Sequence, residues 1–402
     1  MKLTYKHTVT ACFIGYIVQA IINNFAPLLF LTFERDYGIP LGQIGILIGI
    51  NFGVQLTTDF VAALIADKTG WRIPIITAHV LAAAGLIMMA TLPEVMTNKF
   101  LALVISVVTY SIGGGLLEVL ISPITEACPG EDKAAAMSIL HSFYCWGVVG
   151  VVILSTLFFA VFGIDSWKIL AFVWALIPIF NIFLFALVPF GKLEKDDEVR
   201  MPIGRLFKNK YFIIMIIIMF CSASCELSVS QWASAFVEKG LGVNKAVGDL
   251  AGPMMFAVLM GVARLIHAFL GDKIKWSLER MILYSSVLCL ASYLIVSLSP
   301  LPWLSLIGCG ICGFSVGILW PGTFSLASES IRGGGTAMFA ILALFGDLGC
   351  GTGPMVVGTV ASALGDNLNI GILVTAAAPL MLIGCLVIYI TLKKSEKTKK
   401  SA

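Results

Sequence analysis

The chain contains the stretch Ala66-Asp67-Lys68-Thr69-Gly70-Trp71-Arg72 and, about two hundred residues later, the stretch Gly271-Asp272-Lys273, which Glu279-Arg280 follows. Each stretch comes after a long apolar segment of the chain. An acidic and a basic residue repeated at equivalent places in two hydrophobic halves are typical of a duplicated bundle of membrane helices. The repeat therefore predicts a membrane protein built from two related halves.

Composition supports this prediction, because 59% of the 402 residues are hydrophobic and only 12% are charged. A globular core cannot hide that much apolar surface. Charge-poor stretches of about twenty residues or more can cross about 30 Å of hydrocarbon as a helix. We expect an all-α membrane protein with twelve transmembrane helices, at residues 8–33, 41–66, 73–93, 100–128, 134–162, 167–190, 211–237, 249–271, 279–300, 302–330, 335–364 and 368–392.

One interior loop, residues 192–210, is long, charged and free of apolar runs. Such a composition is typical of a linker. Six predicted helices lie on either side of it. We therefore expect two pseudo-symmetric six-helix bundles, at residues 1–191 and 211–402, joined by a cytoplasmic linker at residues 192–210.

The distribution of Lys and Arg predicts the orientation, because the cytoplasmic side of a membrane protein is enriched in them. Placing both termini and the even-to-odd loops on one side gathers 20 of the 26 basic residues there. The opposite side holds Arg35, Lys99, Lys168, Lys239 and Lys245, and Arg264 lies inside the eighth helix. We expect a multi-pass protein of the cell membrane with both termini in the cytoplasm. The net charge of +3 is then explained by the basic residues that orient the protein in the membrane, and we expect no binding to nucleic acid.

The first repeated stretch resembles the signature between helices 2 and 3 of the major facilitator superfamily, with Ala63 where that pattern usually has Gly. The resemblance covers the whole chain and implies a transporter that alternates between inward-open and outward-open states. It implies a cytoplasmic gate formed by Asp67, Gly70 and Arg72 in one half and by Asp272, Lys273 and Arg280 in the other. Physically, Gly70 allows a tight turn and Arg72 can cap the carbonyls of a neighbouring helix. The alternative is a solvated loop that only stabilises the fold.

Five charged residues lie inside predicted helices: Asp59, Glu118, Glu226, Arg264 and Asp347. A charge near the bilayer centre costs about 2.5–3.5 kcal/mol on insertion scales, so such residues usually face a cavity and serve transport. Asp59 and Arg264 lie at matched depth, since each comes eight residues before the Asp of its repeated stretch. We expect one polar layer near the middle of the membrane, in which Arg264 pairs with Asp59 or Glu118. Neutralisation of each carboxyl group by a proton is the alternative.

Amide side chains extend this layer. Asn51, Gln55 and Asp59 recur every fourth residue and so share one face of a helix. Gln19 and Asn23 do the same in the first helix, where Asn24 follows. These side chains are candidates for contacts with a polar substrate.

A narrower resemblance begins with the stretch from Glu118 to Glu126, which is similar to helix 4 of the fucose:proton symporter family, although Ser122 stands where that family has Asn. Further matches are Ser142-Phe143, Glu226 with Trp232, and Trp320-Pro321 with Phe324-Ser325. The chain departs from the family in the first helix, where Asn23 and Asn24 replace an acidic residue. The resemblance implies proton-coupled uptake of a sugar, and the departure implies that the coupling group has moved.

We expect proton coupling to involve Glu118, His141, Asp347 and Asp59. A carboxyl group in a low dielectric can exchange protons near neutral pH, and histidine titrates in the same range. His141 as a neutral core histidine is the alternative, and a sodium ion held by Asp, Asn and backbone carbonyls is the alternative to the proton. No spacing of His, Cys and Glu is typical of a zinc site, and we expect no metal and no cofactor.

A sugar ring stacks on Trp or Tyr, and its hydroxyl groups bond to amides and carboxylates. The predicted substrate-binding residues are Asn23, Asn24, Gln55, Glu118, His141, Tyr144, Glu226, Trp232, Arg264 and Trp320. For the aromatic residues, packing in the protein core is the alternative.

These observations predict a monomeric transporter, not an enzyme, that imports a monosaccharide or similar polar molecule with protons. One rival is a proton-coupled exporter of drugs or metabolites, which often has Gly and Pro late in helix 5; residues 141–150 contain no proline. A second rival is an organic-anion transporter in which Arg264 binds the carboxylate.

Overall fold

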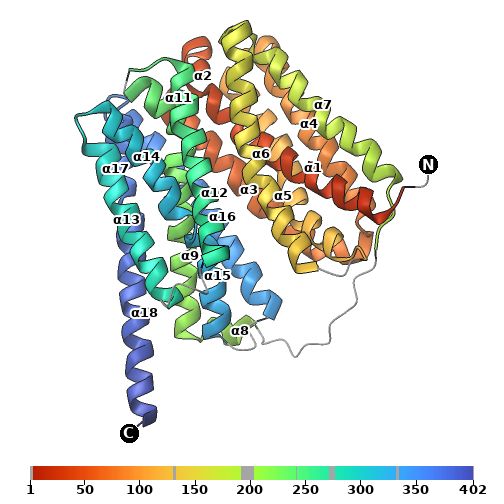
Figure 1. Ribbon diagram of the computed structural model, residues 1–402. Coiled ribbons are helices and arrows are strands. Elements are labelled where there is room, and N and C mark those ends of the chain that lie inside the picture. The colour runs from red at the N-terminus through yellow and green to blue at the C-terminus, as the bar shows by residue number, and fades with distance from the viewer. Residues whose placement is uncertain are drawn as a thin grey trace. The chain divides into compact units, whose positions relative to one another are not determined.

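The computed structural model describes residues 3–129, 133–191, 203–240, 242–270, 277–331 and 335–401. Within these helices, the side chains of residues 63–69, 133–139, 141–142, 203, 240, 268–270, 335–337 and 396–401 lie outside the description. Every regular element in the described ranges is helical (Figure 1). Twelve helical segments among the described residues are long and apolar enough to cross a membrane. The predicted fold class is therefore confirmed.

The twelve segments correspond one to one to the predicted helices. They are Tyr5–Tyr37, Leu41–Ala62, Arg72–Val95, Lys99–Glu126, Phe143–Phe162, Ile164–Leu187, Lys210–Ser230, Lys245–His267, Leu278–Leu298, Pro302–Ser330, Met338–Ala363 and Leu368–Ser395.

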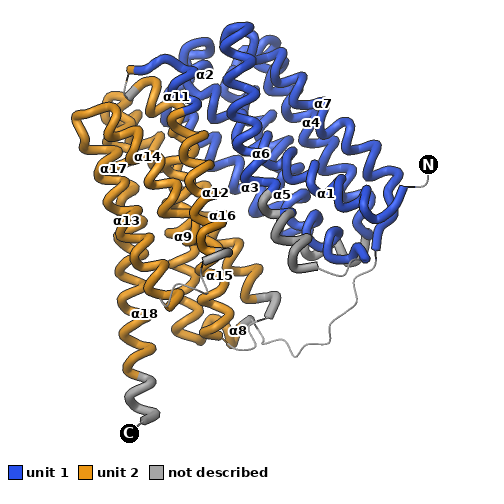
Figure 2. The backbone as a smooth tube through the Cα atoms, viewed as in Figure 1, with its two compact units in different colours: residues 1–196, 243–250 blue, residues 197–242, 251–402 orange. Residues whose placement is uncertain are grey.

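The chain divides into two compact units (Figure 2). Unit 1 comprises Met1–Asp196 together with Val243–Leu250, and unit 2 comprises Asp197–Gly242 and Ala251–Ala402. Unit 1 thus includes the N-terminal end of the eighth span, although its sequence lies in the C-terminal half. Of the predicted linker, residues 192–202 lie outside the described residues.

Unit 1 contains the helices α1 (Tyr5–Asn24), η1 (Ala26–Leu29), α2 (Phe30–Tyr37), α3 (Leu41–Thr69), α4 (Arg72–Val95), α5 (Lys99–Glu126), α6 (Lys133–Phe162), η2 (Ile164–Ser166), α7 (Trp167–Leu187) and α11 (Lys245–Asp249). Within the unit, α5 packs against α3 and α4, α4 packs against α7, and α1 packs against α5, α6 and α7. Helices α1, α3 and α5 are therefore neighbours, which places the polar faces predicted from their sequences in one region.

Unit 2 contains α8 (Ile203–Leu206), α9 (Lys210–Ser230), α10 (Ala233–Ala235), η3 (Phe236–Gly240), α12 (Met255–Leu270), α13 (Leu278–Leu298), α14 (Pro302–Val316), α15 (Leu319–Ser330), α16 (Gly335–Ala363), α17 (Leu368–Thr375) and α18 (Ala377–Ser401). Here α9 packs against α16, α18 and α15, and α14 packs against α12 and α13. The π-helical segment η4 (Leu250–Met254) lies where the chain passes from unit 1 to unit 2.

Glycines let these helices approach closely. A Cβ atom on Gly113 would lie 2.6 Å from the carbonyl oxygen of Ala78 in α4, and one on Gly115 would lie 2.8 Å from that of Gln55 in α3. In unit 2, Gly349 of α16 faces the carbonyl of Phe220 in α9 so closely that a Cβ atom would overlap it. The glycine runs in α5 and α16 are therefore packing surfaces, as expected for membrane helices.

Candidate functional site

A buried group of polar side chains joins α1, α3 and α5 in unit 1. We call it the amide cluster: Gln19, Asn23, Asn51, Gln55 and Ser111, each at most 6% exposed. Gln55 Nε2 donates to Asn23 Oδ1 at 2.9 Å and to Asn51 Oδ1 at 3.0 Å. Ser111 Oγ lies 2.7 Å from Asn51 Oδ1, and Asn51 Nδ2 lies 3.2 Å from Asn23 Oδ1. The structure thus brings the predicted residues Asn23 of α1 and Gln55 of α3 together.

Glu118 of α5 lies beside this cluster. Its side chain is exposed, although it sits well inside the span Lys99–Glu126. Gln19 Nε2 donates to Glu118 Oε2 at 3.4 Å and to Gln55 Oε1 at 2.9 Å. Gln19 therefore connects the carboxylate to the amide cluster. The sequence placed Gln19 on the polar face but did not identify it as this connection.

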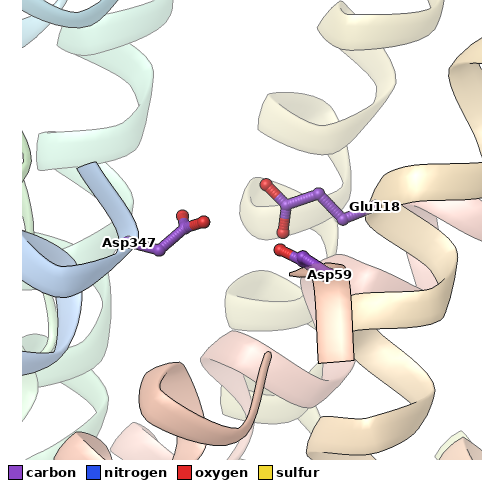
Figure 3. A group of neighbouring side chains, drawn as sticks. All are labelled: Asp59, Glu118 and Asp347. Atoms are coloured by element: carbon purple, nitrogen blue, oxygen red, sulfur yellow. The ribbon is translucent and has the colours of Figure 1, made fainter. Parts of the chain in front are cut away.

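Asp59 and Glu118 bring two carboxyl groups together on neighbouring helices of unit 1 (Figure 3). One oxygen of each lies within 4.8 Å of the other. Coulomb repulsion between two carboxylates at this distance favours a state in which the pair holds a proton or a cation. Figure 3 also draws Asp347, which α16 of unit 2 carries. The two unit 1 carboxyl groups offer oxygen ligands of the kind that sodium accepts.

In unit 2, Arg264 of α12 pairs with Glu226 of α9, with Nη2 and Oε2 3.7 Å apart. Arg264 Nε also donates to the carbonyl of Gly317 at 3.3 Å. That carbonyl would accept from residue 321 in a regular helix, but Pro321 has no N–H group. Arg264 therefore binds both a carboxylate and the carbonyl that the proline leaves without a helical partner. The predicted pairing of Arg264 with Asp59 or Glu118 stays a prediction.

The two predicted tryptophans of unit 2 differ in environment. Trp232 is completely buried, and its Nε1 donates to the carbonyl of Pro354 in α16 at 2.9 Å. This geometry favours the packing alternative for Trp232. Trp320 is half-buried, lies against Gly346, and meets Phe324 edge to face with ring centroids 6.0 Å apart. Gly346 precedes Asp347, so the Trp320 ring packs against α16 one residue away from Asp347 in the sequence.

Three further predicted binding residues are Asn24, Tyr144 and His141. The Asn24 side chain donates to the carbonyl of Ala20 in its own helix at 3.0 Å. Tyr144 is half-buried in α6. His141 belongs to α6, but its side chain lies outside the described residues. The role of His141 stays a prediction.

Arg72 of the first repeated stretch caps the end of α7 within unit 1. Its guanidinium group donates to the carbonyls of Ala186 and Val188, the latter at 2.9 Å, and lies over the Phe190 ring at 4.9 Å. The carbonyls at a helix end lack helical partners, so a cation there stabilises the end. Gly70 ends α3 with φ +68°, a left-handed conformation that glycine tolerates best. The expected carbonyl capping is confirmed.

The second repeated stretch lies largely outside the described residues, including Asp272 and Lys273. Arg280 is exposed in the first turn of α13, while its neighbour Glu279 pairs with Lys393 of α18 at 3.3 Å. The side chain of Asp67 lies outside the description as well. The gate assigned to Asp67, Gly70, Arg72, Asp272, Lys273 and Arg280 stays a prediction.

One buried ion pair escaped the sequence analysis. Asp249 is completely buried, and its Oδ1 lies 3.1 Å from Lys245 Nζ. The same ammonium donates to the carbonyl of Leu28 at 2.5 Å. Thr156 Oγ1 donates to Asp249 Oδ2 at 3.4 Å. A Lys and an Asp four residues apart on a helix is a signal that could have identified the pair.

Comparisons with known proteins agree with this architecture. A family model described as the Major Facilitator Superfamily matches residues 10–354. Membrane protein MosC of Rhizobium meliloti is 22% identical to this chain over 362 residues, which are 90% of this chain and 85% of that protein.

Three crystal structures are similar in fold. A bacterial homolog to the human lysosomal transporter Spinster, inward-facing and occupied, has a TM-score of 0.79 at 14% identity and covers 96% of this chain and 97% of its own. The nucleoside transporter NupG has a TM-score of 0.77 at 12% identity, and the match covers 96% of this chain and 99% of NupG. The transporter FucP in the outward conformation has a TM-score of 0.63 at 14% identity, covering 94% and 98%. With the family model spanning most of its length, this chain belongs to the Major Facilitator Superfamily and is a membrane transporter.

Proposed function

We propose that this transporter imports a monosaccharide or a similar polyhydroxylated molecule together with protons, acting as a monomer that alternates between inward-open and outward-open states. The observation that carries the proposal is the amide cluster beside the exposed carboxylate of Glu118. Amide groups both donate and accept hydrogen bonds, and so do the hydroxyl groups of a sugar. Buried polar groups inside a membrane are costly, which favours a role in transport.

The pair Asp59 and Glu118 supports coupling to protons. Their oxygens lie within 4.8 Å in helices that cross the membrane, where repulsion favours a shared proton. Glu118 also contacts Gln19 of the amide cluster at 3.4 Å, so proton and substrate would bind next to each other. Asp347 and His141 remain further candidates for the proton path.

Two rival functions have less support. An organic-anion transporter would use Arg264 to bind the substrate, but that guanidinium group already pairs with Glu226 and the Gly317 carbonyl. An exporter of amphipathic drugs would need an apolar cavity, whereas Glu118 contacts the Gln19 amide and lies within 4.8 Å of the Asp59 carboxyl group.

Substrate class is tested by thermal-shift measurements on the purified protein with panels of sugars, organic acids and cationic dyes, because a ligand raises the melting temperature of the state it binds. We expect sugars to raise it. A shift caused only by organic acids would contradict sugar transport and favour the organic-anion transporter. A shift caused only by dyes would favour the drug exporter instead.

Coupling is tested in proteoliposomes with the sugar that binds best. Glu118→Gln should abolish accumulation driven by a pH gradient and leave exchange of sugar across the membrane partly intact, because exchange needs no net proton movement. Glu126→Gln is the matched control, since Glu126 is an exposed carboxylate on the same helix. Undiminished accumulation in Glu118→Gln contradicts the proton role.

A further inference from the structure

Gln19 occupies a particular place between the carboxylate and the amide cluster. Both N–H groups of its amide are used, one toward Glu118 Oε2 at 3.4 Å and one toward Gln55 Oε1 at 2.9 Å. The side chain is only 3% exposed. Its own carbonyl oxygen, Oε1, is buried without a hydrogen-bond partner among the described residues. A buried acceptor without a donor carries a free-energy cost.

An ionised Glu118 would fix the direction of this network. A carboxylate accepts hydrogen bonds and donates none, so the N–H side of Gln19 must face it. Gln55 must then present its oxygen to Gln19 and its N–H groups to Asn23 Oδ1 and Asn51 Oδ1. The assignment of oxygen and nitrogen in these amides thus follows from one ionised group.

Protonation of Glu118 would reverse the requirement. The carboxylic acid gains an O–H donor, and Gln19 Oε1 is one nearby acceptor that has no donor among the described residues. Turning the Gln19 amide by a half rotation brings that oxygen to the acid. The same rotation removes the N–H group from Gln55 Oε1, so that two amide oxygens face each other. A hydroxyl group of the substrate that donates to one of these oxygens would then stabilise the site.

We propose that Gln19 is a positioning residue that couples protonation of Glu118 to binding of a hydroxyl-bearing substrate at Gln55. This inference rests on the proposed function and adds how binding of the proton affects binding of the substrate. By linkage, a substrate that binds the turned amide also favours the protonated acid, typically by about 5–150-fold.

Two other titratable side chains of unit 1 lie near Glu118 and would affect the pH at which the change occurs. Asp59 of α3 lies within 4.8 Å, and Tyr16 of α1 bonds to Ser122, one turn along α5, at 3.2 Å. Removing the charge of Asp59 with Asp59→Asn should move the pH of the transition and leave the dependence on Gln19 in place.

The first experiment needs no substrate. Infrared difference spectra of the purified protein between about pH 5 and about pH 9, a range that lies above the ordinary pKa values of carboxyl groups and includes that of histidine, record the C=O stretch of protonated Glu118, assigned by its loss in Glu118→Gln. In the unmodified protein we expect the low wavenumber of an acid that donates a hydrogen bond. Gln19→Met should move the band to higher wavenumber. An unmoved band contradicts the proposal.

Gln43→Met is the matched control, because Gln43 lies in the first turn of α3, away from the amide cluster in sequence. It should leave the band where it is. A shift of equal size in both variants would show a general effect on the fold and would overturn the proposal.

The second experiment measures binding of D-glucose, D-galactose and L-fucose across the same pH range. We expect affinity in the unmodified protein to fall about tenfold as pH rises, within the usual range of coupling between sites. Glu118→Gln carries a permanent N–H donor in place of the acid, so it should bind with an affinity that does not vary with pH. Failure of all sugars to bind rejects the proposed function, whereas a pH-dependent affinity in Gln19→Met rejects the coupling.

Discussion

At the scale of single residues, the polar layer exists because small residues make room for it. Gly115 of α5 sits opposite α3, where a Cβ atom would lie 2.7 Å from Asp59 Oδ1 and 2.8 Å from the carbonyl of Gln55. Gly114 faces the Gln55 side chain, with the nearest amide atoms at 3.1 Å. The positions of Gln55 and Asp59 therefore depend on the absence of side chains on the neighbouring helix.

Gly115→Ala should lower stability by about 1–3 kcal/mol, because an extra methyl group in a tightly packed contact forces the helices apart. The melting temperature of the purified protein measures the loss. Gly53→Ala is the matched control, since Gly53 lies in α3 with no atom within 4 Å of its Cβ position. That change should be stabilising by about 0.5–1 kcal/mol, as for glycine in a helix interior. Equal effects in both variants would contradict the packing role of Gly115.

The sequence was sufficient to place residues on one helix, and insufficient to pair residues from different helices. A spacing of four predicted the shared face of Asn51, Gln55 and Asp59, because helix geometry fixes it. The pairing of Arg264 with Glu226 depends on which helices are neighbours and on their rotation, which no local pattern encodes. Asp249 was missed because it lies at the start of a predicted span, where charged residues are common and do not indicate burial.

At the scale of helices, several spans are broken where a proline removes an N–H group. The tenth span consists of α14 (Pro302–Val316) and α15 (Leu319–Ser330), and Pro321 leaves the carbonyl of Gly317 without a helical donor. Arg264 supplies the donor from α12 at 3.3 Å. The break at Pro321 and the Arg264 cation therefore depend on each other structurally, although they lie far apart in the sequence.

This dependence predicts a coupling in a double-mutant cycle. Arg264→Ala leaves a buried carbonyl and Glu226 without their donor, which should cost about 1–3 kcal/mol for each buried group left unsatisfied. Pro321→Ala restores a backbone N–H group, so Arg264→Ala should cost less in that background, with an interaction energy of about 0.5–3 kcal/mol. Melting temperatures of the four proteins test it, and additive effects would refute it.

The eighth span shows a second break, at the π-helical segment η4 (Leu250–Met254), which contains Pro253. On the N-terminal side of this break, the pair Lys245 and Asp249 anchors α11 to unit 1 through the Leu28 carbonyl, Thr156 and, at 5.8 Å, the Phe159 ring. The anchored end and the rest of the span therefore belong to different compact units.

Lys245→Met should be strongly destabilising, by about 3–5 kcal/mol, because it leaves the completely buried Asp249 without its cation. Adding Asp249→Asn should recover much of the loss by removing the buried charge. Lys239→Met is the control: Lys239 and Asp366 are 3.8 Å apart with side chains 31% and 41% exposed, so the expected loss is under about 1 kcal/mol. Similar losses in Lys245→Met and Lys239→Met would show that burial of the pair has little effect.

At the scale of the whole molecule, the duplication predicted from the two repeated stretches reappears as a contact between equivalent helix ends in each unit, made by different chemical groups. In unit 1, Arg72 at the start of the third span binds carbonyls at the end of the sixth. In unit 2, Glu279 at the start of the ninth span binds Lys393 near the end of the twelfth. Equivalent helix ends are joined in each unit, once by a cation on carbonyls and once by an ion pair. The sequence predicted the repeat of the loop but not this change of chemistry.

The distribution of basic residues makes a testable prediction for the whole chain. Because Lys and Arg are enriched on the cytoplasmic side, both termini should lie in the cytoplasm and the loop at Asp165 outside. Native thiols give little background: nine of the ten cysteines are buried, and burial raises the pKa of Cys128, the one that lies outside the spans. Fewer Cys128 thiolates are then present at neutral pH, and its labelling should rise as the pH increases.

Cysteines introduced at Asp165, whose side chain is 86% exposed, and at Ser401 should therefore report opposite sides of the membrane. A membrane-impermeant maleimide added to intact cells at neutral pH should label Asp165→Cys and leave Ser401→Cys unlabelled until the membrane is permeabilised. The unsubstituted protein should remain unlabelled in both conditions. Labelling of Ser401→Cys in intact cells would reverse the orientation, and with it the side from which the repeated loops Ala66–Arg72 and Gly271–Lys273 could close the transporter.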